Sequence, residues 1–105
     1  MKLGRVKVTF DAELWQWEAR RGDSWIFVSL PVDASDEIGD LTAGEKRGFG
    51  SVRVRATIGR TSWATSIFPD GSRGAYALPV KKSVRVAEGI APGDVATVSV
   101  EVVDH

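Results

Sequence analysis

The chain has 105 residues and a mass of 11.4 kDa, which fits one domain with one core. Apolar residues make up 43% and charged residues 27%, the balance of a globular rather than a disordered protein. The absence of cysteine excludes disulfides, thiolate metal sites and cysteine nucleophiles, and the only histidine is the last residue, His105. We therefore expect a single domain over residues 1–105 that is not an enzyme, with no catalytic residues, no metal and no cofactor.

The first patterned segment is 5–14, where apolar and polar residues alternate. A period of two predicts a half-buried strand. After Leu14 the apolar positions shift, because Trp15 and Trp17 now carry them. We expect a bulge or sharp bend at this point that keeps both apolar sets buried.

A turn and a second strand follow. Residues 20–23 are typical of a turn, with Gly22 supplying a positive φ. Residues 25–30 are apolar on nearly both faces, which favours a central strand, and Pro31 ends it.

Residues 33–41 predict a short helix, because its apolar residues recur at helical spacing. Asp33 is the expected N-cap. The acidic residues of this helix, which could hold a cation, are interpreted as a solvated face, since their spacing lacks the pattern of a calcium loop. They are Asp33, Asp36, Glu37 and Asp40. The glycine-rich stretch 44–50 predicts a loop that could move.

The clearest hairpin spans residues 51–68. Gly59-Arg60 predicts a two-residue type II′ turn. In this register the inner face takes Val52, Val54, Ala56, Trp63, Thr65 and Ile67, and the outer face takes Arg53, Arg55, Ser62, Ala64, Ser66 and Phe68.

Three further elements are expected in the last third of the chain. Residues 74–78 predict a short strand, and 80–88 a short helix closed by Gly89. Residues 95–103 predict the last strand. In total we expect an all-β fold, a small closed or nearly closed β-barrel of about six strands with two short capping helices, since closure removes exposed edges.

The C-terminal half resembles the bacterial domain of unknown function 1905. The residues that carry the resemblance are Pro69-Asp70-Gly71, 74–79, 82–85 and 89–94, with Trp25, Leu30-Pro31 and Gly59 in agreement. The resemblance implies a small β pseudo-barrel capped by helices, and it implies no activity, because that family has no established one.

A more distant similarity is to swapped-hairpin barrel transcription factors of the antitoxin type. It rests on Leu78-Pro79, Arg85, Gly89-Ile90 and Gly93-Asp94. The shared element is mainly geometric: a proline begins the helix, a glycine ends it, and Gly-Asp turns the chain into the next strand. Because this chain has enough strands to close a barrel alone, a monomer is favoured.

Charge is unevenly distributed along a chain whose net charge is zero. Residues 46–85 carry nine basic side chains against Asp70 alone. The candidate ligand-binding residues are Arg53, Arg55, Lys81, Lys82 and Arg85. They favour an anionic ligand, with Ser62 and Ser66 beside the two strand arginines. The alternatives are that folding interleaves the charges, and that Arg85 bonds the last helix carbonyls and pairs with Asp94.

The four tryptophans could form either a core or a stacking platform. We interpret Trp25 and Trp63 as core residues, since tryptophan in a small barrel is more often buried. Trp15 and Trp17 lie beyond the expected bend, and their place stays open.

Two functions are carried forward. The first is a binding module for a small molecule or peptide at the barrel mouth, gated by the glycine-rich loop. The alternative is a nucleic-acid-binding or regulatory domain that uses the basic segment 46–85. No signal peptide and no apolar stretch long enough for a membrane span are present, so a cytoplasmic location is expected.

The helix end at Gly89 generates a stability prediction. A left-handed residue there excludes a β-branched side chain, so Gly89→Val should lower the free energy of unfolding by more than about 1 kcal/mol. Thermal unfolding measures it, and an unchanged melting temperature would contradict it.

Overall fold

The computed structural model describes residues 6–20, 23–42 and 50–103. Its elements are β1 (Lys7–Glu13), β2 (Trp15–Arg20), β3 (Asp23–Ser29), α1 (Val32–Leu41), β4 (Val52–Ile58), β5 (Thr61–Asp70), β6 (Ala75–Pro79), α2 (Lys82–Glu88) and β7 (Val95–Val102). Gly22 in the expected turn, residues 44–49 of the expected loop and His105 lie outside the described residues.

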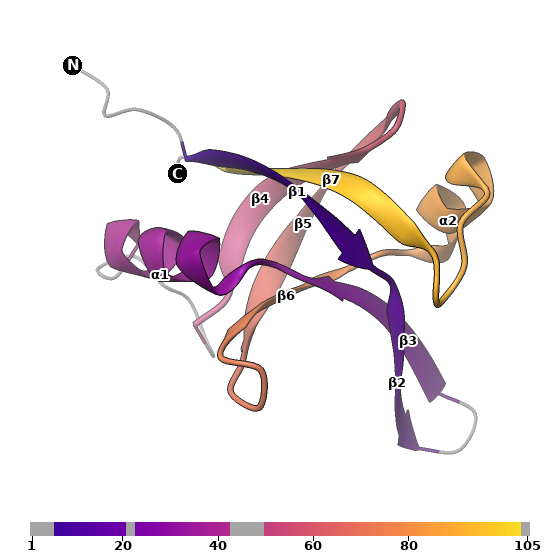
Figure 1. Cartoon of the computed structure of the whole chain (residues 1–105), viewed down its shortest axis with the longest axis horizontal. Coiled ribbons are helices and arrows are strands. Elements are labelled where there is room, and N and C mark those ends of the chain that lie inside the picture. The colour runs from indigo at the N-terminus through magenta and orange to yellow at the C-terminus, as the bar shows by residue number, and fades with distance from the viewer. Residues whose placement is uncertain (1–5, 21–22, 43–49, 104–105) are drawn as a thin grey trace.

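The strands form one antiparallel sheet in the order β1-β7-β4-β5-β6-β3-β2. The sheet curls into a half-barrel, with α1 and α2 at opposite ends of it (Figure 1). All-β architecture with two helices is therefore confirmed, while the expectation of about six strands and a closed barrel is wrong. The additional strand is β2, and the sheet stays open because its two edge strands, β1 and β2, pair with different neighbours.

The strand break at Leu14 explains both corrections. Leu14 is 1% exposed, its N–H donates to the carbonyl of Asp94 at 2.9 Å, and its carbonyl accepts from the N–H of Gly93 at 2.8 Å. The chain bends there, leaves β7 and continues along β3. Alternation persists through the bend, so the expected burial of both apolar sets is wrong: Leu14 faces the core, and Trp15 and Trp17 face outward.

Helix α1 packs on the sheet beside β6. Ile38 is fully buried, and Ser35, which is 5% exposed, accepts the N–H of Tyr76 at 2.9 Å through its hydroxyl. This bond satisfies a strand donor beyond the end of β3. The expected N-cap at Asp33 is wrong. Pro31 occupies the N-cap and no side chain caps the helix, because the helix begins directly after the proline.

The hairpin of β4 and β5 has the expected register. Val54 is opposite Thr65 and Ala56 is opposite Trp63. Gly59 has a φ of +59°, and no described residue other than glycine has a positive φ. The outer residues therefore alternate with core residues along both strands, as the hydropathy pattern predicts.

Helix α2 begins two residues later than expected. Val80 is extended along β3, because its N–H donates to the carbonyl of Ile26 at 2.9 Å. The C-terminal end is as expected, with Gly89 left-handed at φ +67°. The carboxylate of Glu88 accepts from the N–H of Arg60 at 3.2 Å and from the hydroxyl of Thr61 at 2.6 Å. This contact holds α2 against the β4–β5 turn.

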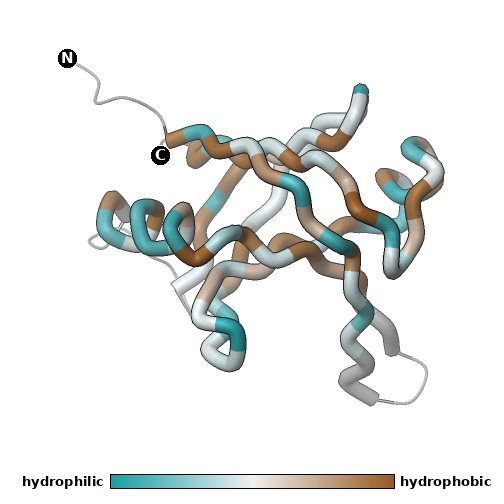
Figure 2. The backbone as a smooth tube through the Cα atoms, viewed as in Figure 1, coloured by the Kyte–Doolittle hydropathy of each residue, from teal (hydrophilic) through white to brown (hydrophobic). Residues whose placement is uncertain are grey.

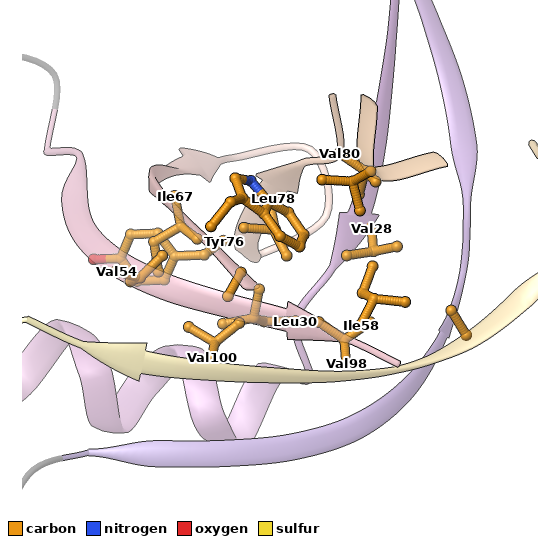
Figure 3. Packing of buried hydrophobic residues seen from close by; sticks show 14 of the residues in the cluster. Val28, Leu30, Val54, Ile58, Ile67, Tyr76, Leu78, Val80, Val98 and Val100 are labelled. Carbon is orange, nitrogen blue, oxygen red and sulfur yellow. The ribbon is translucent and has the colours of Figure 1, made fainter. Parts of the chain in front are cut away.

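The core lies inside the curl of the sheet. Hydrophobic and hydrophilic residues alternate along the strands (Figure 2), and the inward ones pack together (Figure 3). The residues without any exposed area include Val28, Ile38, Ala56, Ile67, Leu78, Val98 and Val100. No helix in the described part of the chain is both long and apolar enough to cross a membrane.

The Glu88 contact generates a prediction about Gly59. A Cβ at this position would overlap the Glu88 carboxylate, and the backbone φ of +59° disfavours alanine as well. Gly59→Ala should therefore cost about 1–2 kcal/mol in backbone strain together with the Glu88 hydrogen bonds. Chemical denaturation measures the free energy of unfolding.

Two glycines provide matched controls. Gly89→Ala meets open space at φ +67°, so it isolates the backbone cost, while Gly71→Ala meets open space and has no positive φ. Equal destabilisation by Gly59→Ala and Gly89→Ala would contradict a role for the Glu88 contact.

Candidate binding groove

The outer face of β2, β3, β6 and β5 carries a cluster of aromatic side chains. Trp15 is paired with Phe27 and Trp17 with Trp25 across β2 and β3. Phe68 of β5 is opposite the small side chain of Ala77 on β6. Because the inner faces of these strands are committed to the core, alternation directs all of these side chains outward.

These aromatic residues are much more exposed than a core residue. Trp17 is 50% exposed, Trp25 is 54% and Phe68 is 42%, whereas Trp63 is 7%. The core interpretation is thus correct for Trp63 and wrong for Trp25. Residues 25–30 were expected to be buried on both faces, but only the face of Ile26 and Val28 points into the half-barrel.

Three of the rings form a row. The centroids of Trp15 and Phe27 are 5.0 Å apart with 29° between the ring planes, and those of Trp25 and Phe27 are 6.4 Å apart with 20°. The indole N–H of Trp15 donates to the hydroxyl of Ser29 at 3.0 Å, which satisfies its polar atom and orients its ring. The row is therefore ordered by contacts within the protein.

The aromatic residues border an open groove with a volume of about 580 Å³. Its lining consists of Trp15, Trp17, Trp25, Phe27, Phe68, Pro69, Asp70, Ser72, Arg73, Ala77 and Pro79. Ala77 and Pro79 of β6 lie between the larger side chains of β3 and β5, so β6 forms a low floor between two aromatic walls.

The β5–β6 turn supplies the polar rim of the groove. The Asp70 carboxylate accepts from the N–H of Ser72 at 3.2 Å and from its hydroxyl at 2.8 Å. It also contacts Nε of Arg73 at 3.4 Å. The Arg73 guanidinium lies 3.9 Å from the centroid of the Trp15 ring. The turn thus places a cation on one aromatic face of the groove.

A second hollow, of about 640 Å³, adjoins the first. The two share Pro69 and Asp70 in their linings. Asp36 and Asp40 of α1 line the second hollow together with Asp70. No three acidic or histidine side chains in the described residues are grouped so that they could hold a metal ion.

The structure separates the five cations that the sequence analysis singled out. Arg53 and Arg55 are exposed on the outer face of β4, and Lys81 and Lys82 are exposed at the beginning of α2. Helix α2 contacts the turn end of the hairpin, while Arg53 lies five residues before Ile58, roughly 17 Å back along the strand. The five do not form one patch, and none of them lines the groove.

Their neighbours are also partly different from those expected. Ser66 is opposite Arg53, as expected, but Ser62 is opposite Thr57 and shares a hydrogen bond of 2.7 Å with it. Arg55 is opposite Glu101, which is opposite Lys7 on its other side, so folding interleaves acidic and basic residues here.

Arg85 has a structural contact at the other end of α2 from the one expected. Its Nε donates to the carbonyl of Val80 at 3.1 Å, before the helix, rather than to the last helix carbonyls. Asp94 does not pair with it in the contacts observed, and accepts the N–H of Ala91 at 2.9 Å.

The groove generates a prediction about the division between core and surface. Trp63→Ala should cost about 3–5 kcal/mol in the free energy of unfolding, because it empties a buried site. Trp25→Ala should cost less than about 1.5 kcal/mol, because half of its surface is already hydrated and only the Phe27 contact is lost.

Denaturant unfolding of both variants tests this difference. Comparable destabilisation would contradict the assignment of Trp25 to a surface kept free for another molecule.

Comparison with known proteins covers the same part of the chain. The family model described as Domain of unknown function (DUF1905) matches residues 10–100, a range that contains all four strands of the groove. No curated protein matches the chain. The chain therefore belongs to the family Domain of unknown function (DUF1905).

Proposed function

We propose that this protein is a non-catalytic binding module that holds an extended peptide segment in the aromatic groove. The observation that carries the proposal is the exposure of Trp17, Trp25 and Phe68 around one groove. Exposed apolar patches of this kind mark interaction sites, because leaving such surface in water forgoes the free energy of burying it.

The position of the groove moves the proposed site away from the barrel mouth. The interior of the curl is occupied by the core cluster (Figure 3), whereas the outer face holds both an apolar floor and a polar rim. A mostly apolar hollow with a few convergent polar groups is the usual form of a ligand site.

The shape of the groove favours a peptide over a compact molecule. It crosses four adjacent strands, a width of roughly 14 Å at the usual strand spacing, which equals about four residues of extended chain. Ring faces that are ordered beforehand suit proline and aromatic side chains, and a segment already extended in solution loses little entropy on binding.

The rim supports binding rather than catalysis. The Asp70 carboxylate is engaged by Ser72 and Arg73, so its contacts position the turn and orient a guanidinium. A general base needs to reach a substrate proton, whereas this carboxylate already accepts several hydrogen bonds and an ionic contact.

The test is selection from a displayed library of random peptides of about ten residues, long enough to cross the groove. Binding of the selected peptides is then followed by tryptophan fluorescence, which Trp17 and Trp25 should report directly. Trp17→Ala and Trp25→Ala should each weaken binding at least tenfold, the effect of removing an aromatic residue near the centre of an interface.

Val86→Ala is the matched control, because Val86 is 70% exposed on α2 and lies outside the groove. It should leave affinity unchanged. Failure to select any peptide, or equal binding by the tryptophan variants and the wild type, would overturn the proposal.

Nucleic-acid binding and an anionic ligand at Arg53, Arg55, Lys81, Lys82 and Arg85 stay predictions. The separation of these cations supports them less than the groove supports a peptide. A single-stranded oligonucleotide that binds in a salt-dependent manner, and loses affinity in Arg53→Ala/Arg55→Ala, would favour nucleic acid instead.

A further inference from the structure

We infer that the peptide bound in the groove is basic: its apolar residues lie on the aromatic floor, and a lysine or arginine side chain next to them enters the adjoining acidic hollow. This inference rests on the proposed function and adds the chemistry of the ligand to it. It is carried by the continuity of the two hollows, the charge around them and a cation already bound to the groove.

The two hollows form one continuous surface around the β5–β6 turn. Pro69 and Asp70 line both of them, and Asp70 is the polar end of the aromatic groove. An extended chain that crosses the groove toward β5 therefore meets the second hollow next, without leaving the protein surface. A side chain at that end of the peptide has the length to pass Asp70.

The charge on this surface has one dominant sign. Asp36 and Asp40 are four residues apart on α1, so they project from the same side of the helix, and Asp70 faces them from the turn. No lysine or arginine lines the second hollow, and Arg73 is the only one that lines the groove. Charge complementarity therefore selects a basic partner over an acidic one.

Arg73 shows how a cation is held at this boundary. Its guanidinium lies 3.9 Å from the ring centroid of Trp15, and its Nε contacts the Asp70 carboxylate at 3.4 Å. An aromatic face and a carboxylate thus share one guanidinium inside the groove. The faces of Trp17 and Trp25, which remain about half exposed, are available for a second cation of the same kind.

The decisive experiment uses one peptide selected by the full chain and an analogue in which each arginine is replaced by citrulline and each lysine by acetyl-lysine. The analogue keeps the shape of the peptide and removes its charge. We expect it to bind the wild type about tenfold more weakly, and the difference to shrink in Asp36→Asn/Asp40→Asn. Binding of the charged peptide should also weaken with added salt.

Asp33→Asn is the matched control, because Asp33 is exposed on the same helix and lines neither hollow. It should preserve the tenfold preference. Circular dichroism of the variants checks that α1 is intact, since the substituted carboxylates are on its exposed face.

The outcomes separate the two proposals. If the neutral analogue binds as tightly as the charged peptide while Trp17→Ala still weakens both, the inference of a basic ligand is overturned and the binding function stands. If the preference for charge is the same in Asp36→Asn/Asp40→Asn as in the wild type, the acidic hollow is not its origin and the inference is also overturned. If no peptide is bound at all, both proposals fail.

Discussion

The bend at Leu14 is the constraint on which the rest of the structure depends. Its N–H and carbonyl both bond to the turn before β7, and its side chain is almost completely buried in the core. The strand on one side of the bend therefore completes one edge of the sheet, and the strand on the other side completes the opposite edge. One residue thus links the two edges of a half-barrel that no ladder of hydrogen bonds closes.

The aromatic groove is a direct consequence of this bend. Since alternation continues through it, the side chain of Leu14 points inward and the next two odd-numbered positions point outward. Pairing with β3 then brings Trp15 onto Phe27 and Trp17 onto Trp25. A bulge that shifted the register by one residue would have turned every one of these rings to the other face, and the outer surface would have no groove.

Small residues and a structured turn give the groove its shape. Ala77 and Pro79 leave space between β3 and β5, and the turn after β5 is held by the bonds between Asp70 and Ser72. Helix α1 then brings Asp36 and Asp40 to the other side of the same turn. Its position depends on the buried bond between Ser35 and the backbone of Tyr76, so the hollow beside the groove is built by a contact within the fold.

Local patterns in the sequence determined the elements of the sheet and several of their ends. The alternation in β4, β5 and β7, the turn at Gly59 and the left-handed end of α2 at Gly89 all follow from the residues that form them. Each depends on interactions within one element or between neighbours in the chain, such as the freedom of glycine at positive φ. The match to the family adds that the whole arrangement is shared, but local chemistry already indicated these elements.

Only the tertiary structure decided which residues meet. A period of two identifies the faces of a strand, but it does not show which face is inward when both are apolar, as they are around Trp25 and Phe27. The same limit applies to the five cations, because closeness in sequence between β4 and α2 says nothing about their separation in a curled sheet. The groove joins residues from 15 to 79, and it exists because the sheet order places β2, β3, β6 and β5 side by side.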